Sequence, residues 1–202
     1  MSTEPTSPLK TIRFRITGIR PLLMHNGLLA DPTNPTVIAM KRITAKKNKK
    51  TEADHEELAR LEWIGGLYRG ASGELVIPAD NIERCIQDGA KKSRLGKDCQ
   101  AAVFCVESEV PIEHADLKGE VESLYGKPAF TLRKGVKVTT SRVIRVRPMI
   151  PTGWTMTFNL EYDETIINRK SIEQAARDAG ALIGLGDWRP KFGRFTVETL
   201  KG

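Results

Sequence analysis

The spacing of the apolar residues predicts an α+β fold in which an antiparallel sheet carries helices on one face. Residues 11–19 and 154–162 alternate apolar and polar side chains, which is typical of strands with one buried face. Residues 52–68 and 80–94 instead place apolar side chains three and four positions apart, which indicates amphipathic helices. The order of strand, two helices, several strands, helix and strand fits an α+β plan.

The first strand predicts a basic surface on the sheet. Ile12, Phe14 and Ile16 would face the core, and Arg13 and Arg15 would then face the opposite way, because successive side chains of a strand alternate. We expect Arg13 and Arg15 to contact an anionic ligand if that face of the sheet is open.

A long basic loop is predicted over residues 26–51. The Pro, Asn, Gly and Asp residues after the first strand end it and favour irregular structure. The loop contains the run KRITAKKNKK, residues 41–50, which has no acidic residue. Lys46 and Lys47 are candidates for nucleic-acid contact, and a solvated loop without a ligand is an equal alternative.

Polar side chains predict where two helices begin. Thr51 and Asp54 are suited to cap the helix that follows them. Ser171 and Gln174 have the spacing of a capping box for a final helix over residues 171–184.

The remaining extended segments complete the predicted sheet. Residues 73–77 and 101–106 suggest short strands, and residues 130–150 are extended before a Pro-Thr-Gly turn. Residues 154–162 form the clearest strand, which we expect to pair with the residues before that turn. A last strand is predicted over residues 195–200.

Length and composition predict one domain, residues 1–202. The chain is 40% apolar and 28% charged, the balance of a soluble globular protein. No apolar run approaches the roughly 20 residues that a membrane helix needs. The first ten residues resemble a short loose arm and lack a secretory signal. Three cysteines without a CxxC spacing favour a reducing compartment, so we expect a cytoplasmic protein with no metal and no cofactor.

The distribution of charge indicates an anionic partner more strongly than the net charge of +7 and the pI of about 9.4 do. No acidic residue occurs between Glu122 and Glu161. We expect a basic hairpin over residues 127–153 that binds phosphates, although a solvated basic face is the alternative. Its candidate contacts are Lys134, Lys137, Arg142 and Arg145.

The segment GLGDWRPKFGR, residues 184–194, is the main candidate site. Glycine lets a backbone turn sharply and approach a ligand closely, and basic and aromatic side chains suit phosphates and bases. A helix C-cap followed by a turn into a strand is the alternative for the glycines, and a core or interface position is the alternative for the tryptophan. The candidate residues are Gly184, Gly186, Trp188, Arg189, Lys191, Gly193 and Arg194.

The final helix, this glycine-rich segment and the closing strand resemble the glycine-rich signature of the RAMP superfamily of CRISPR proteins. The segment GELVIPADNIERCIQDGAKK resembles the strand, Ile-Pro and basic helix of the backbone subunits of CRISPR effector complexes. Together these strong motifs cover about a quarter of the chain. The resemblance implies a ferredoxin-like or RRM-like core, with the basic hairpin as a thumb and the basic loop as a further insertion.

Two residues raise the question of catalysis. His25 follows the first strand, where related CRISPR-RNA endonucleases carry a catalytic histidine, and an imidazole can act as general acid or base on a ribose hydroxyl. Asp31 lies in an early loop where some backbone subunits carry an acid that helps to cleave target RNA. Each stands alone in the sequence, and a structural or solvent-facing role is the alternative for both.

The sequence therefore predicts a non-catalytic, sequence-independent binder of single-stranded nucleic acid, with RNA first and DNA as the alternative, and the resemblance implies that this RNA is a guide RNA. The resemblance adds self-association along the ligand into a filament and other CRISPR subunits as partners, in a bacterial, archaeal or phage setting. Two alternatives remain open. One is a phage- or plasmid-encoded relative that binds single-stranded DNA or mimics a CRISPR subunit, and the other is a metal-independent endoribonuclease that uses His25.

Overall fold

A computed structural model describes residues 9–139 and 141–201 of the chain, which fold as a mixture of helices and antiparallel sheets. The predicted α+β class is confirmed at this level. The arm expected at the N-terminus falls mainly on residues 1–8, which lie outside the described residues.

The main sheet has four strands in the order β4 (Val103–Cys105), β8 (Thr155–Asp163), β1 (Leu9–Gly18) and β9 (Phe195–Leu200). All neighbouring strands are antiparallel. The prediction that β8 pairs with the residues before the Pro-Thr-Gly turn is wrong. Alternation identifies the buried face of a strand but leaves its partner undetermined, and β8 pairs with β1 and β4 instead.

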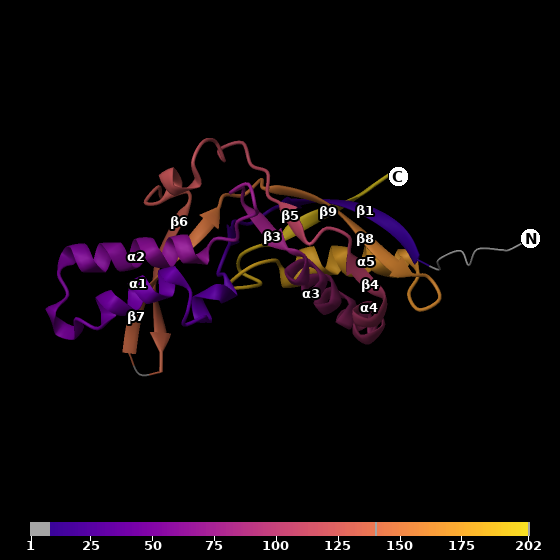
Figure 1. Cartoon of the computed structure of the whole chain (residues 1–202). Helices are drawn as coiled ribbons and strands as arrows, with labels where there is room; N and C mark the ends of the chain where they lie inside the picture. The colour runs from indigo at the N-terminus through magenta and orange to yellow at the C-terminus, as the bar shows by residue number, and fades with distance from the viewer. Residues whose placement is uncertain (1–8, 140, 202) are drawn as a thin grey trace, which may run out of the picture.

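Helices α3 (Ala79–Ala90) and α5 (Arg169–Asp178) pack on one face of this sheet, with α4 (Gly96–Ala102) beside α3 (Figure 1). The apolar side chains of β1 and β8 are buried beneath them, including Phe14 and Phe158. The other face of the sheet is open, as the exposed side chains of β1 show. Helices α3 and α5 therefore cover one face of the main sheet (Figure 1).

A second sheet lies at the other end of the molecule (Figure 1). Strands β6 (Thr131–Val138) and β7 (Ser141–Ile150) form the predicted hairpin, and β2 (Leu22–Leu23) adds a third strand beside β7. Helix α2 (Glu52–Gly66) packs on β7, and α1 (Pro35–Thr44) packs on α2. A small pair of strands, β3 (Val76–Pro78) and β5 (Glu109–Pro111), lies between the two ends.

The prediction of a long loop over residues 26–51 is wrong, because helix α1 occupies the centre of this segment. Asn34 caps this helix by accepting a hydrogen bond from the Thr36 amide, and Pro35 fills the first turn, where its missing N–H costs nothing. Val37 is buried against the rest of the fold. Short 3-10 turns, Gly27–Ala30 and Lys47–Lys49, flank the helix.

The predicted helix starts are half correct. Thr51 and Asp54 cap the start of α2 as predicted, and together they form a capping box. The box predicted at Ser171 and Gln174 is wrong, because the cap is Asn168, whose side chain accepts a hydrogen bond from the Ser171 amide. Helix α5 ends at Asp178 and continues as a π-helical turn, Ala179–Ile183.

The predicted strand over residues 101–106 is shorter than expected, since α4 runs to Ala102 before β4 begins. None of the helices within the described ranges is long and apolar enough to cross a membrane.

Candidate nucleic-acid interface

The glycine-rich loop, residues 184–194, leads from the π-helical turn to β9 and folds back on itself. Gly184, Gly186 and Gly193 have φ values of +81°, +81° and +72°. A Cβ on Gly193 would lie 1.7 Å from the Leu185 carbonyl oxygen, and one on Gly186 would lie 2.2 Å from the Leu23 carbonyl oxygen. The loop's own packing therefore requires these glycines, and the predicted ligand contact depends on its side chains.

Trp188 of this loop contacts the hairpin. The Lys134 ammonium lies 5.6 Å from the centre of the indole, and the Arg147 guanidinium lies 5.8 Å from it. Both distances are within the range of cation–π attraction. Phe192 lies beside the same ring at 6.3 Å between centroids. The half-buried Trp188 therefore joins the loop to β6 and β7.

A buried ion-pair network reinforces this junction. Arg147 Nε donates to Asp187 Oδ2 at 2.9 Å, and Arg147 Nη1 donates to Glu62 Oε1 at 2.6 Å. The Asp187 amide also donates to the carbonyl oxygen of Leu23. Helix α2, strand β7 and the glycine-rich loop are thus held by one arginine.

The glycine-rich loop meets helix α3 at a second charged cluster, formed by Arg84, Asp88, Lys91 and Arg189, which we call the α3–loop cluster. Arg189 Nη1 lies 3.9 Å from Asp88 Oδ2, and Arg84 Nε lies 3.4 Å from Asp88 Oδ1. Lys91 donates to the same carboxylate at 2.7 Å. Burial acts to raise the pKa of Asp88, but the Lys91 hydrogen bond and the neighbouring cations outweigh it and hold this pKa below its ordinary value. Three cations share one carboxylate, so the cluster has excess positive charge.

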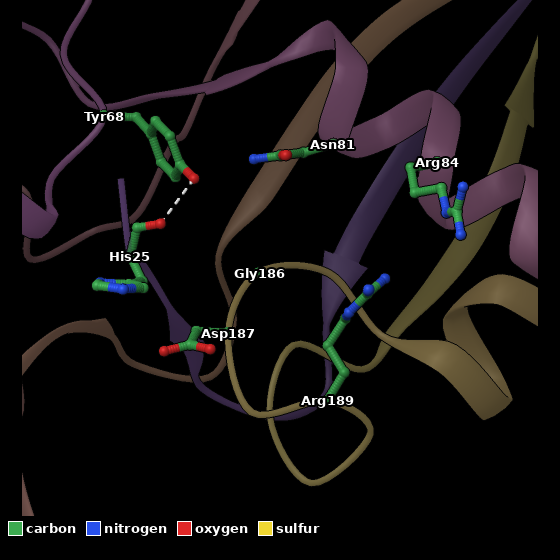
Figure 2. A pocket seen from close by; sticks show the side chains of 7 residues that line it. All are labelled: His25, Tyr68, Asn81, Arg84, Gly186, Asp187 and Arg189. Atoms are coloured by element: carbon green, nitrogen blue, oxygen red, sulfur yellow. Dashed lines mark hydrogen bonds between the residues drawn. The ribbon is translucent and has the colours of Figure 1, made fainter. Parts of the chain in front are cut away.

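Beside this cluster lies a cavity of about 130 Å³. Figure 2 shows His25, Tyr68 and Asp187 on one side of it and the guanidinium groups of Arg84 and Arg189 on the other. The Tyr68 hydroxyl donates to the His25 carbonyl oxygen at 3.0 Å. The remaining lining residues are Asn81 and Gly186.

His25 is therefore part of this cavity and not an isolated loop residue. Burial, followed by the nearby charge of Arg147, lowers the pKa of His25 below its ordinary value of 6.5. The imidazole is consequently neutral at pH 7, with one nitrogen able to accept a proton.

Two larger cavities continue from His25 toward the hairpin. The first, of about 470 Å³, shares His25 with the small cavity and is lined by Lys41, Arg145 and Arg147. The second, of about 660 Å³, shares Arg145 with the first and extends to Arg133. These shared residues make a groove from the α3–loop cluster, between α1 and β7, to the hairpin. We call it the basic groove.

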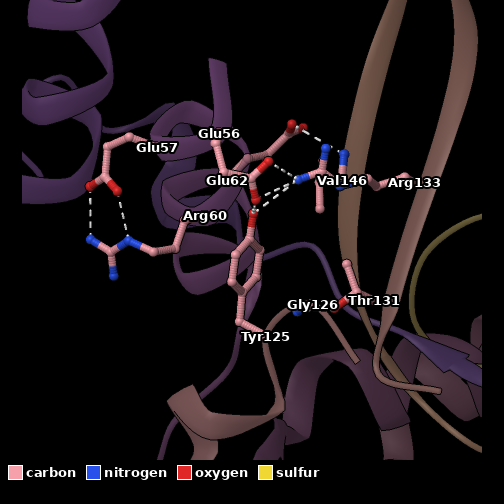
Figure 3. A network of polar contacts seen from close by, with 9 residues as sticks. All are labelled: Glu56, Glu57, Arg60, Glu62, Tyr125, Gly126, Thr131, Arg133 and Val146. Carbon is pink, nitrogen blue, oxygen red and sulfur yellow. Dashed lines mark hydrogen bonds and ion pairs between the residues drawn. The ribbon is translucent and has the colours of Figure 1, made fainter. Parts of the chain in front are cut away.

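Helix α2 supplies the acidic partners that the hairpin sequence lacks. Arg133 donates to both oxygens of Glu56, at 2.6 and 2.8 Å, and Tyr125 donates to the same carboxylate (Figure 3). These hydrogen bonds, that of Tyr125 first, hold the pKa of Glu56 below its ordinary value. Arg145 Nη1 lies 3.6 Å from Glu62. Part of the acid-free window is therefore neutralised within the fold.

The outer part of the hairpin retains like charges opposite one another. Lys137 lies directly across the strands from Arg142, and farther from the tip Lys134 lies across from Arg145, which has Glu62 nearby. Like charges directly opposite each other destabilise a hairpin. Within the described residues, neither Lys137 nor Arg142 forms an ion pair with the protein. An anion bound between such residues would relieve the repulsion.

The structure does not bring Arg13 and Arg15 to this site. Both lie on the open face of the main sheet. Glu198 is directly across from Arg15 on β9, and Glu161 lies on β8 of the same sheet. Charge on that face is therefore nearly balanced.

The other predicted contacts are dispersed. Lys46 pairs with Asp54 at 2.6 Å, and Lys47 lies in the turn after α1. Lys191 is exposed at the loop tip. Arg194 is half-buried, and its Nε is buried without a hydrogen-bond partner among the described residues.

Asp31 has a local structural partner. Its carboxylate accepts hydrogen bonds from the amide and the hydroxyl of Thr33, which lower its pKa. Across the described ranges, the acidic, histidine and cysteine side chains form no group of three or more that could hold a metal ion.

The sequence reasoning missed four of the residues that line the small cavity, Tyr68, Asn81, Arg84 and Asp187. Arg84 was recognisable as a polar position of a basic helix, but its position facing the loop depends on how α3 packs. Tyr68 and Asn81 had no sequence signal, because they belong to segments that only the fold brings to the cavity.

Comparison with known proteins does not classify the chain. It matches no protein-family model, and no curated protein is significantly similar to it.

Proposed function

We propose that this protein binds single-stranded nucleic acid, with RNA as the first candidate and DNA as the alternative. The core follows a ferredoxin-like plan in this proposal. Its two halves run β1-α3-β4 and β8-α5-β9, and the sheet order places β1 and β8 at the centre. Such an arrangement is compatible with the RAMP-type resemblance of the glycine-rich segment.

The observation that carries the proposal is the convergence of Arg84 and Arg189 at Asp88. They come from the two segments that resemble the RAMP superfamily, which are about 100 residues apart in the sequence. Guanidinium groups bind phosphate oxygens with good geometry. A phosphate beside them would meet positive charge that one carboxylate only partly neutralises.

The hairpin extends the same positive surface. Lys134, Arg145 and the outer pair Lys137 and Arg142 would bind further phosphates of a strand that follows the basic groove. Contacts of this kind position a strand without reading its bases, so binding would be largely independent of sequence. Self-association along the strand, and assembly with other subunits of a CRISPR-type complex, belong to the same proposal, as does a cytoplasmic location.

A filter-binding series tests the proposal. The protein would be titrated into single-stranded RNA and DNA oligonucleotides, for example of 10, 20 and 30 nucleotides, at several salt concentrations. We expect nanomolar to micromolar binding that weakens steeply with salt, because each neutralised phosphate releases counterions. No binding of a 30-nucleotide strand at low salt would overturn it. Tighter binding of DNA than of RNA would favour a single-stranded DNA-binding relative.

Cleavage is a second candidate, because His25 lines the same cavity as Arg84 and Arg189. A neutral imidazole could take the proton of a ribose 2′-hydroxyl as its oxygen attacks the neighbouring phosphorus. The P–O5′ bond then breaks to leave a 2′,3′-cyclic phosphate, and the departing 5′ oxygen takes a proton from the imidazolium, while a guanidinium stabilises the intervening phosphorane. The experiment is to incubate the protein with an RNA that has the sequence of a CRISPR repeat, in the presence of a chelator that removes metal ions. Cutting that His25→Ala abolishes without loss of binding supports it, and intact RNA removes it.

A further inference from the structure

The cavity beside the α3–loop cluster has two chemically different sides. One side carries two cations, Arg84 and Arg189, which share Asp88. The opposite side carries the ring of Tyr68, the imidazole of His25 and the carboxylate of Asp187, and Asn81 projects between the two sides (Figure 2). The asymmetry indicates a ligand that is anionic at one end only.

Asn81 is the least explained of these groups. It lies in the first turn of α3, and its side-chain amide has no hydrogen bond to another of the described residues. An amide offers both a donor and an acceptor. A phosphate has only acceptors at neutral pH and could use the donor alone, so the acceptor of the half-buried Asn81 is available to a ligand that also carries donors.

We propose that this cavity binds one nucleotide unit of the strand, with its phosphate at Arg84 and Arg189 and its base against Tyr68 and Asn81. A base has a flat face for the ring, and its edge has donors and acceptors for the amide. Every base has such a face, so the pocket is compatible with binding that is independent of sequence. The inference rests on the proposed function and adds a base pocket to a phosphate surface.

The lining of the basic groove explains why we assign a base pocket to only one nucleotide of the strand. Beyond His25 the lining changes to Lys41, Arg145 and Arg147 with apolar residues of α1. That stretch offers Lys41 and the partly exposed Arg145 for phosphates. Glu62 also lines it and pairs with Arg145 and Arg147. Among the described residues of its lining, no second aromatic ring lies beside a side-chain amide without a hydrogen bond. The strand would therefore be gripped by its backbone along the groove and by one base at its end.

The decisive experiment uses ligands that differ only in their bases. Oligo(dT) of 30 units would be compared with a 30-unit strand of abasic deoxyribose phosphates, which has the same length and charge. A competition assay would compare uridine monophosphate with ribose 5-phosphate at equal concentration. Stacking of one base is worth about tenfold in affinity, so we expect the base-containing ligand to bind about tenfold more tightly in both assays.

The outcomes separate this inference from the proposed function. Equal affinity for the two strands, and equal competition by the two small molecules, overturns the base pocket and leaves backbone binding intact. Failure of both strands and of 30-nucleotide RNA to bind overturns the proposed function together with the pocket. Because these comparisons use the unaltered protein, they do not depend on how a variant folds.

Variants locate the pocket. Asn81→Ala and Tyr68→Leu should each reduce the tenfold preference for bases, measured in the same variant as the ratio of its affinities for oligo(dT) and for the abasic strand. Tyr68→Phe is the matched control, because it keeps the ring and removes only the hydroxyl that donates to His25. Folding would be checked by circular dichroism. A preference that survives both substitutions in folded protein places the base elsewhere and overturns the assignment.

Discussion

Arg147 and Asp187 form an ion pair, with 2.9 Å between Nε and Oδ2, that fastens the hairpin to the glycine-rich loop. The arginine side chain is only 9% exposed, and its other end binds Glu62 of α2. The hairpin and the loop therefore hold a fixed relative position. The phosphate contacts that we propose on both of them depend on this one buried cation.

We expect Arg147→Ala to lower the free energy of unfolding by about 3 kcal/mol, because it leaves Glu62 and Asp187 without their shared partner. Urea denaturation at pH 7 measures the change. The same variant should also alter Trp188 fluorescence, since Arg147 lies 5.8 Å from the indole centre.

Arg145→Ala is the matched control for this substitution. Its side chain is 42% exposed and lies 3.6 Å from Glu62. Exposed pairs contribute little, so we expect a loss below about 1 kcal/mol. Equal losses for the two variants would contradict the role assigned to Arg147.

Gly193→Ala tests whether the glycine-rich loop is constrained by its own packing. The new Cβ would lie 1.7 Å from the Leu185 carbonyl oxygen at a φ of +72°. We expect the loop to be displaced and the free energy of unfolding to fall by more than about 2 kcal/mol, the upper cost of the left-handed conformation alone. Thermal and urea unfolding would measure it.

Gly119→Ala separates the steric term from the backbone term. Gly119 has a φ of +79°, but a Cβ there has no atom within 4 Å. It should cost only the backbone strain, about 1 kcal/mol. If the two substitutions lower the free energy of unfolding equally, overlap with Leu185 is not the reason that position 193 requires glycine.

Much of the secondary structure followed from local patterns, whereas the site required the tertiary fold. The alternation in β1 and β8 identified their buried faces, and Thr51 with Asp54 marked the start of α2, because each signal lies within a few residues. Pairing depends on distant partners, so the sequence pattern predicts the wrong neighbour for β8. Helix α1 was missed because its Asn-Pro start resembles a turn when its packing on α2 is unknown.

The same reasoning explains the candidate site. Arg189 was predicted from the composition of its loop, but its partner Arg84 becomes relevant only through the contact at Asp88. The sequence predicts a basic hairpin over residues 127–153 that binds phosphates. The fold shows that Glu56 and Glu62 of α2 neutralise its inner arginines and leave its outer cations unpaired within the described residues.

The outer pair of the hairpin, Lys137 and Arg142, should affect binding without supporting stability. These exposed residues face each other across the strands. Replacing both with Gln removes repulsion, so the free energy of unfolding should stay the same or rise by up to about 0.5 kcal/mol. Nucleic-acid affinity should fall, and the slope of log K against log salt should become shallower by about 2.

Filter binding across a salt series, with urea denaturation of the same samples, checks both effects. Lys10→Gln is a suitable control, because Lys10 lies on β1 of the main sheet and pairs with Glu164. An unchanged salt slope in the hairpin variant would show that its tip does not contact phosphates.

Asp54 gives the protein an acid-sensitive contribution to stability. A hydrogen bond from Lys46, followed by one from the Thr51 amide, lowers the pKa of Asp54 from 3.8 to about 2. A carboxyl whose pKa is depressed in the folded state stabilises above its unfolded pKa, and the effect is lost as pH falls through the folded pKa. Asp54→Asn should therefore be less stable than the wild type at pH 6, and the difference should shrink between pH 4 and pH 2.

Urea denaturation at pH 6, 4 and 2 measures this difference, and an undiminished gap at pH 2 would refute the assignment. Lys46→Met provides the control. Because this substitution removes the largest cause of the shift, it should raise the pKa of Asp54, measured as the midpoint of a carboxyl NMR titration.

The last prediction distinguishes two basic surfaces that lie on different parts of the fold. Arg84→Gln with Arg189→Gln removes two cations from the cavity and should weaken strand binding by about tenfold or more, with a salt slope shallower by about 2. Arg13→Gln with Arg15→Gln removes the same formal charge from the open face of the sheet, where Glu161 and Glu198 offset it. Equal net charge makes the pairs comparable, since long-range attraction falls equally in both. A larger loss for the second pair would move the binding surface to the sheet, as the sequence first suggested for Arg13 and Arg15, and would leave the α3–loop cluster as a structural contact only.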